Sequence, residues 1–206
     1  MNRTIRVGVL LTALLSLFAI GASTASAVTW HNTGNTTFTA TGGATTLSST
    51  GVTIACTGAD VAGTAPGGSV IAATWVASGT AQFTGCRMAG ISATVTCDYS
   101  GTGTSWVAGP PGVTSGAVDI RCTSIQGGTP VCITEGQVAG TYTNPTGATR
   151  GIGNLPASNT VRVTNANGGN CPLGNGDAVT LTAGVYTITT GTGGSGTAGP
   201  IVTRTP

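Results

Sequence analysis

Short runs in which threonine alternates with an apolar residue recur along the chain, for example in residues 37–41, 160–164 and 185–189. Alternate side chains of an extended strand share a face, so such runs predict strands with one apolar and one polar face. Turn-forming Gly and Pro clusters, such as residues 66–68 and 109–112, separate the runs. About a dozen short strands at this spacing predict an all-β fold, a single antiparallel β-sandwich or flattened β-barrel.

The first 27 residues have the pattern of a secretory signal peptide. Arg3 and Arg6 precede an apolar stretch at 7–20, and small residues at 25–27 form a cleavage site. We therefore expect a secreted, extracellular protein, free or loosely associated with the cell surface. The expected organisation is a signal peptide at 1–27, a β-sandwich or barrel domain at 28–190 and a flexible Gly/Thr/Pro tail at 191–206.

Charge is scarce and balanced after residue 27. The formal net charge of +2 comes from Arg3 and Arg6, because the remaining arginines and the acids are equal in number. A neutral chain lacks the basic surface that nucleic acids bind. No later stretch is long and apolar enough to span a bilayer as a helix. We expect no nucleic-acid partner and no membrane span in the mature chain, and we consider self-association or a cell-surface glycan as partners.

All six cysteines lie after residue 27. An even number in a secreted chain indicates structural disulfides, and the spacing lacks the close pairs typical of a metal site. Cys97 and Cys122 end two predicted strands that a Pro-Pro loop joins, so these two cysteines are expected to pair with each other. The expected disulfides are Cys97–Cys122, Cys56–Cys86 and Cys132–Cys171. The main alternative joins Cys122 to Cys132 across the turn at 127–128.

Few residues of the mature chain could carry out catalysis. His31 is the one histidine, too few for a zinc site, and is expected at the surface. Asp98 and Asp119 could form a glycosidase pair, although Asp119 shares a strand face with Arg121, which suits an ion pair. Asp177 is expected in a turn that lacks the alternating acids of a calcium loop. We expect no enzyme activity, metal or cofactor, with a two-carboxylate hydrolase as the lesser alternative.

Large aromatic residues are few, and most are expected in the core because they fall in apolar strands. Trp106 is different, since it follows a Gly-Thr-Gly-Thr segment that predicts an exposed position. Exposed aromatic rings stack on sugars or hold small apolar molecules. Trp106 and the neighbouring Tyr99 are therefore the candidate ligand contacts.

Several short motifs resemble those of small secreted proteins of about this length from actinobacteria. The motifs are residues 83–86, Trp106, residues 115–120, Cys132 followed by 136–142, residues 171–177 and residues 186–188. The resemblance implies an extracellular, disulfide-bonded β protein and brings no activity or site residue with it. Cys97 and Cys122 are additions to the shared pattern.

The sequence favours a secreted, non-enzymatic structural or interaction protein that pairs through exposed sheet edges. The alternative is an extracellular binding module for carbohydrate or a small apolar ligand. The two classes differ in an observable way. Aromatic rings aligned on one face favour a glycan, an enclosed apolar cavity favours a small ligand, and neither feature favours a structural role.

Overall fold

The computed structural model describes residues 28–72, 74–147, 149–166, 171–192 and 199–205, and these form strands and turns without a helix. The predicted signal peptide, residues 1–27, lies outside the described residues. The strands are β1 (Thr29–Asn32), β2 (Thr37–Gly42), β3 (Thr45–Ser49), β4 (Val52–Cys56), β5 (Gly58–Thr64), β6 (Gly68–Ile71), β7 (Trp75–Met88), β8 (Ile91–Val107), β9 (Val113–Gln126), β10 (Thr129–Thr143), β11 (Ile152–Leu155), β12 (Ser158–Ala166), β13 (Ala178–Leu181), β14 (Gly184–Thr192) and β15 (Val202–Thr205).

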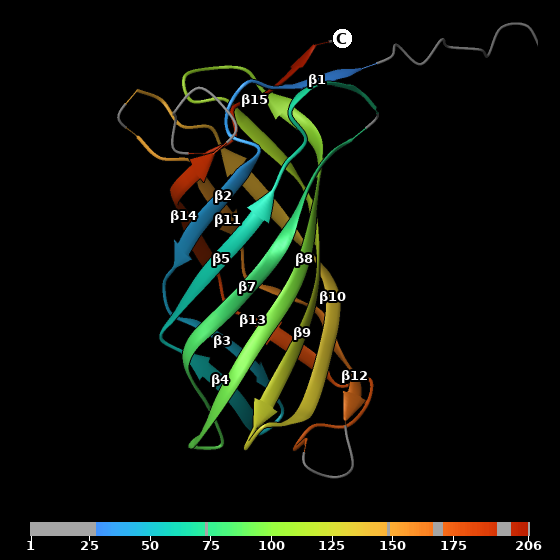
Figure 1. The fold of residues 1–206 in the computed structure, drawn as a ribbon. Coiled ribbons are helices and arrows are strands. Elements are labelled where there is room, and N and C mark those ends of the chain that lie inside the picture. Colours follow the sequence, from blue (N-terminus) through green and yellow to red (C-terminus); the bar gives the residue numbers. More distant parts are fainter. Residues whose placement is uncertain (1–27, 73, 148, 167–170, 193–198, 206) are drawn as a thin grey trace, which may run out of the picture.

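Four long consecutive strands, β7 to β10, form one half of a closed barrel wall (Figure 1). The other half has two tiers of short strands. The upper tier runs from β10 through β11, β14, β2 and β5 to β7, and the lower tier runs from β10 through β12, β13, β3 and β4 to β7. Every pairing is antiparallel, which confirms the expected class. Because both tiers join β7 to β10, the architecture is a closed barrel and not a two-sheet sandwich.

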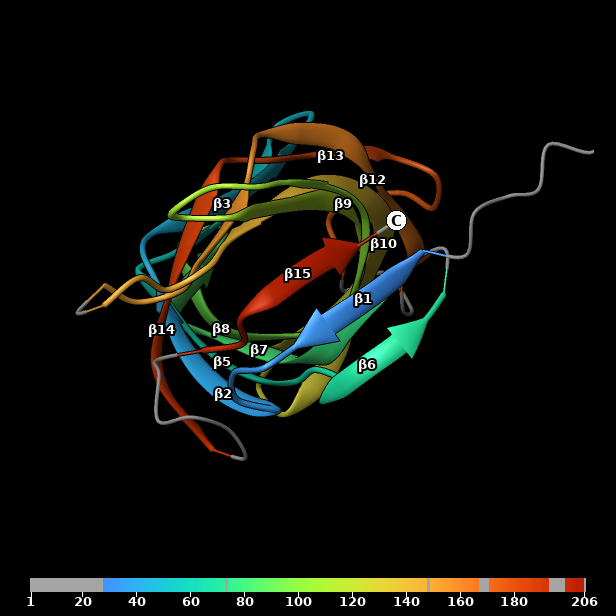
Figure 2. The same ribbon diagram turned by 90° about the horizontal axis from the view of Figure 1, so that it is seen from above.

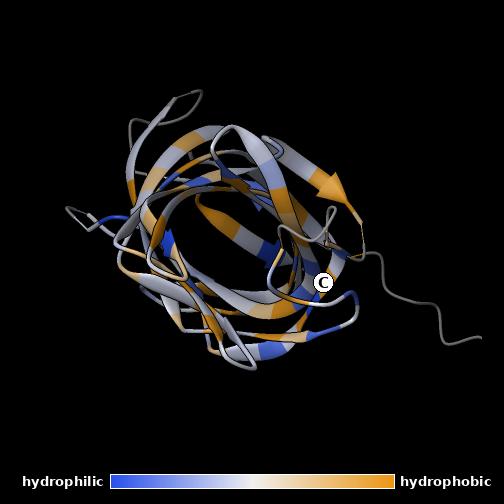
Figure 3. Cartoon of the chain, turned by 90° about the horizontal axis from the view of Figure 1, so that it is seen from below, coloured by the Kyte–Doolittle hydropathy of each residue, from blue (hydrophilic) through white to orange (hydrophobic). Residues whose placement is uncertain are grey.

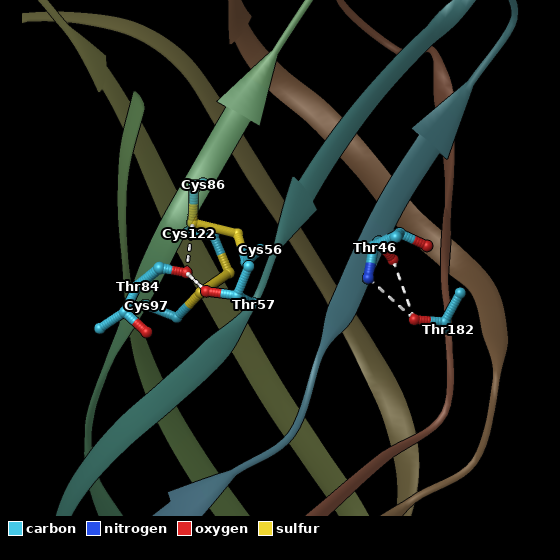
Figure 4. Close-up of a disulfide and its surroundings, with 8 residues drawn as sticks. All are labelled: Thr46, Cys56, Thr57, Thr84, Cys86, Cys97, Cys122 and Thr182. Atoms are coloured by element: carbon cyan, nitrogen blue, oxygen red, sulfur yellow. Dashed lines mark hydrogen bonds between the residues drawn. A yellow bond between two sulfur atoms is a disulfide. The ribbon is translucent and has the colours of Figure 1, made fainter. Parts of the chain in front are cut away.

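The chain passes from the lower to the upper tier between β4 and β5. Gly85 has a φ of 59° and accompanies a register shift in β7 opposite this junction. Thr57 donates its backbone N–H and its hydroxyl to the Thr84 carbonyl oxygen, at 2.9 and 3.1 Å (Figure 4). The disulfide Cys56–Cys86 joins β4 to β7 beside these hydrogen bonds. A covalent bond and two hydrogen bonds therefore hold the place where the tiers meet.

The described structure contains three disulfides, and each joins a pair that the sequence analysis expected. They are Cys56–Cys86, Cys97–Cys122 and Cys132–Cys171. All six cysteines are buried. Cys97 and Cys122 lie directly opposite each other on β8 and β9, so the covalent bond reinforces a register that the backbone ladder already defines. The disulfides indicate an oxidising compartment.

A separate three-stranded sheet, in the order β15-β1-β6, lies across the upper mouth of the barrel (Figure 2). We call this sheet the lid. Its central strand places Trp30 on the buried side, fully shielded from solvent, in a cluster with Trp75 and Val202. Part of the segment expected to be an unstructured tail therefore belongs to the fold, because Val202–Thr205 pairs along the whole of β1.

The lower half of the barrel is a packed core. Inward-facing residues there are almost fully buried, including Met88, Val95, Val161 and Val163. Outward positions carry mainly Thr and Ser, and the ribbon seen from below is pale with few strongly polar segments (Figure 3). Threonine hydroxyls thus hydrate the outer face where other proteins use charge. None of the described residues belongs to a helix that could cross a bilayer.

Candidate ligand-binding cavity

A cavity of about 190 Å³ lies inside the upper half of the barrel. Side chains from most strands of the upper ring contribute to its wall, and almost all of the lining is apolar. Prominent members are Phe38, Tyr99, Val118, Ile120, Leu155 and Tyr186. The Cys97–Cys122 disulfide lies in the wall as well. The described lining residues include no Asp, Glu, Lys, Arg or His, so the site offers no counter-charge to an ionised ligand.

The inward residues of the upper half are less tightly packed than those of the lower half. Val118, Ile120 and Leu155 point inward but remain only half-buried. At corresponding inward positions lower in the barrel, Val95 is 1% exposed and Val161 is 0% exposed. The same strands therefore enclose a filled core at one end and an open interior at the other.

Glycines at inward positions create the space. Gly101, Gly116, Gly140 and Gly153 line the cavity on four neighbouring strands, β8 to β11. A Cβ atom built on Gly101 meets nothing closer than 3.7 Å, and one built on Gly153 nothing closer than 3.9 Å. At Gly116, in contrast, a Cβ atom would collide with the Thr102 carbonyl oxygen. Gly101 and Gly153 are therefore the positions where a methyl group would enter the cavity without strain.

Burial controls the ionisation of the cavity tyrosines. Desolvation raises the pKa of Tyr99 to about 12. Desolvation also raises the pKa of Tyr142 and, against a smaller opposing effect of a hydrogen bond with Thr45, that of Tyr186. The shifts in pKa mean that ionisation of these phenols is disfavoured even in alkaline solution, because the charged form would lose its hydration inside the wall.

The lid closes the cavity from above. Pro200, next to β15, is part of the cavity lining and accepts a hydrogen bond from the Tyr142 hydroxyl at 2.8 Å. The side chain of Asn144 pairs with the backbone of Val202 in both directions, with Nδ2 donating at 2.7 Å and Oδ1 accepting at 3.0 Å. Arg204 lies over the Trp30 ring, 5.4 Å from its centroid. The lid therefore rests on side-chain contacts with the barrel.

The two candidate ligand contacts, Tyr99 and Trp106, both face the barrel interior. Tyr99 is part of the cavity wall. Trp106 is half-buried and packs against the cluster under the lid, so the expected exposed ring is not observed. The reason is a register shift between Gly103 and Ser105, which moves Trp106 onto the inner face of β8.

The carboxylates lie on the outer face of the barrel. Asp98 and Asp119 are both exposed, and Asp119 accepts a hydrogen bond from Gln137 at 2.9 Å. Arg121, expected to pair with Asp119, forms its ion pair with Glu135 across the β9–β10 ladder, at 3.1 Å. Neither acid lies in the cavity, so the two carboxylates that the hydrolase alternative requires are not part of the cavity wall.

The remaining polar candidates have structural surroundings. His31, on the outer side of the lid, contacts the hydroxyls of Ser69 and Thr205 on the two flanking strands, at 2.8 and 3.2 Å. Asp177 accepts the Gly174 N–H at 2.8 Å and closes the predicted turn. Within the described residues, no group of three or more His, Cys, Asp or Glu residues could hold a metal ion.

The sequence analysis did not identify the glycines and the lid as parts of a site. One signal was present: Gly101 and Gly103 fall in the same alternating phase as Tyr99, and Gly140 falls in the phase of Tyr142. Glycine in the apolar phase of a strand indicates a missing side chain on the inner face. Small closed β-barrels either fill their interior with side chains or leave room for one small molecule. Comparisons with protein-family models, curated proteins and solved structures found no match for the chain.

Proposed function

We propose that this protein is an extracellular binding protein for a small apolar molecule held inside the barrel. The observation that carries the proposal is the apolar cavity of about 190 Å³ beneath the lid. Ligand sites in proteins are typically concave and mostly apolar, with few polar groups. An apolar cavity inside the barrel favours a small ligand over a glycan or a structural role.

An empty cavity of this kind is costly, which supports a bound state. At about 24 cal/mol per Å³, 190 Å³ of void costs roughly 4–5 kcal/mol relative to a filled interior. Two alanines, at Gly101 and Gly153, would reduce the void without a clash. Because the chain has glycine at both positions, the cavity stays larger, and the unliganded protein is less stable than it would be with alanine there.

The volume limits the size of the ligand. A cavity of about 150 Å³ lined by apolar side chains holds benzene. The slightly larger cavity here suits a single ring with a short substituent. The uncharged walls favour a neutral compound, because burial of an unpaired charge carries a large desolvation cost.

The test is the binding of toluene to the mature protein, measured by thermal denaturation and by tryptophan fluorescence. Toluene at about 100 times its dissociation constant should raise the unfolding free energy by about 2.7 kcal/mol. The variant Gly101→Ala places a methyl group in the cavity, so it should bind toluene at least tenfold more weakly while the unliganded protein becomes more stable.

The matched control is Gly43→Ala, because a Cβ atom at Gly43 meets nothing within 4 Å and lies outside the cavity lining. Gly43→Ala should bind toluene as the unaltered protein does. Absence of any toluene effect on the unaltered protein, or equal binding by Gly101→Ala, would contradict the proposal.

The expected structural or interaction role remains a prediction, and it depends on fewer exposed strand edges than the sequence analysis assumed. Closure of the barrel pairs the edges of its strands, so the exposed edges in the described structure are those of the lid, on β6 and β15. Size-exclusion chromatography of the ligand-free protein over a concentration series tests this role. A glycan array tests the carbohydrate alternative, for which saturable binding lost in Trp106→Ala is the expected sign.

A further inference from the structure

All three tryptophans of the chain gather at the mouth of the barrel. Trp30, Trp75 and Trp106 belong to the cluster under the lid, although they come from β1, β7 and β8. Trp30 and Trp75 are 0% and 7% exposed. The cavity reaches this cluster, because Trp75 and Tyr142 take part in both. We call the region where they meet the mouth cluster.

The mouth cluster contains hydrogen-bond donors that have no acceptor within the described structure. The indole Nε1 atoms of Trp30, Trp75 and Trp106 are buried without a partner, and so is the hydroxyl of Thr114, which lies opposite Trp106 in the β8–β9 ladder. Buried polar groups in folded proteins are nearly always hydrogen-bonded, because an unpaired donor loses its contacts with water. Four such groups in one apolar cluster point to an acceptor that the described residues do not supply, either water or a ligand atom.

The chemistry of these groups defines the missing partner. An indole N–H only donates, so the partner must supply acceptor atoms. The described residues of the mouth cluster that line the cavity are uncharged, so a neutral acceptor such as a carbonyl or ether oxygen fits, whereas a carboxylate would be buried without a counter-charge.

We propose that the mouth cluster is a subsite for a neutral hydrogen-bond acceptor on the ligand, whose apolar part occupies the cavity below. The inference rests on the proposed binding function and adds the ligand class: a compact, uncharged ring compound with an oxygen acceptor at one end. Trp75 and Thr114, which line the cavity and carry unpartnered donors, are the residues assigned to that oxygen.

The experiment uses three probes of nearly equal size and shape: acetophenone, α-methylstyrene and benzoate. Acetophenone carries a carbonyl where α-methylstyrene carries a CH₂ group, and benzoate is ionised. Calorimetry or tryptophan fluorescence gives the affinity of each for the full mature protein. Because a carbonyl buried without a donor is disfavoured relative to hydrocarbon, acetophenone should bind at least as tightly as α-methylstyrene only if a donor meets it. Benzoate should not bind.

Two variants that each remove one donor locate the contact. Thr114→Val should weaken acetophenone binding by about fivefold and leave α-methylstyrene binding within about twofold. Trp75→Phe also removes ring volume from the wall, so its expected sign is about a fivefold drop in the ratio of the acetophenone affinity to the α-methylstyrene affinity. Thr114→Val keeps the shape of the side chain, so a folding defect does not confuse its result. Thr80→Val, on the exposed face of the same wall, is the control and should change neither affinity.

The outcomes separate this inference from the function on which it rests. If acetophenone binds more weakly than α-methylstyrene, or if both variants keep the ratio of the two affinities, the mouth cluster holds only water and the subsite is wrong while the binding function stands. If none of the probes binds, the proposed function fails and the subsite with it.

Discussion

At the scale of single residues, the packing of the barrel interior depends on which inward positions are aromatic residues and which are glycines. Tyr99 shows this balance. Its hydroxyl approaches Gly63, where a Cβ atom would collide with it and with the Phe38 ring. The ring therefore packs into the space left by a glycine on another strand, and the hydroxyl is buried without a partner.

This environment predicts a pH dependence of stability. Since burial raises the pKa of Tyr99 from 10.0 to about 12, the folded protein holds this proton more tightly than the unfolded chain. The contribution is fully present below pH 10 and is lost as the pH rises toward 12, by about 2.7 kcal/mol at most. Tyr99→Phe should make this alkaline decline shallower, measured as the urea midpoint at a series of pH values, while the part due to the buried Tyr142 and Tyr186 remains. Parallel curves for both proteins would show that Tyr99 ionises equally in the two states.

At the scale of elements, the lid is held by few contacts and lies between the cavity and solvent. The lid shares no strand with the barrel sheet, and the side chain of Asn144 takes the place of a neighbouring strand for Val202. Asn144 is itself buried and joined through its N–H to the Gly112 carbonyl oxygen. The side chain of Asn144 thus connects the C-terminal strand to the barrel rim, together with the hydrogen bonds from Tyr142 to Pro200 and from Arg204 to Thr104.

We predict that Asn144→Ala loosens the lid. The substitution removes two hydrogen bonds and leaves buried backbone groups of Val202 without partners, which costs about 2–3 kcal/mol locally. Because all three tryptophans lie under the lid, acrylamide should quench their fluorescence more strongly, and bound toluene should exchange faster.

The control for the lid is Asn175→Ala, which removes a single hydrogen bond to the Ala166 N–H in the turn before β13. Quenching should remain at the level of the unaltered protein. Equal quenching in Asn144→Ala and Asn175→Ala would mean that the apolar contacts of Trp30 and Val202 hold the lid without help from Asn144.

At the scale of the whole molecule, the disulfides compensate for a partly hollow interior. They span sequence separations of 30, 25 and 39 residues. In the chain-entropy model each contributes about 3.5–4 kcal/mol, comparable with the free energy that the empty cavity costs. A barrel with this much void and little charge therefore depends on covalent links.

Reduction of the protein should accordingly abolish the fold. With all three disulfides reduced and alkylated, we expect the β-type far-UV circular dichroism spectrum and the thermal transition to be lost at room temperature. Non-reducing peptide mapping of the intact protein should recover the three pairs of the structure. A reduced protein that still melts cooperatively, or a peptide that links Cys122 to Cys132, would contradict this view.

The disulfide pairs and the all-β class could be predicted because they depend on features close together in the sequence. Alternation of period two is a local pattern, and Cys97 and Cys122 lie within two strands, β8 and β9, that are consecutive in the chain. The position of Trp106 could not be predicted, because a one-residue register shift at Gly103–Ser105 exchanges the inner and outer faces of the strand. The ion pair of Arg121 with Glu135 likewise depends on the β9–β10 register.

The sequence by itself determined an uncharged, disulfide-bonded, antiparallel β protein, since composition, periodicity and cysteine spacing act over short stretches of chain. Tertiary structure decided the closure of the barrel, the lid and the cavity. Closure and the lid require strands far apart in the sequence to pair, as β1 does with β15. The cavity exists because the register of neighbouring strands brings inward glycines of β8 to β11 together in one wall, so the same glycines in another register would leave no common space.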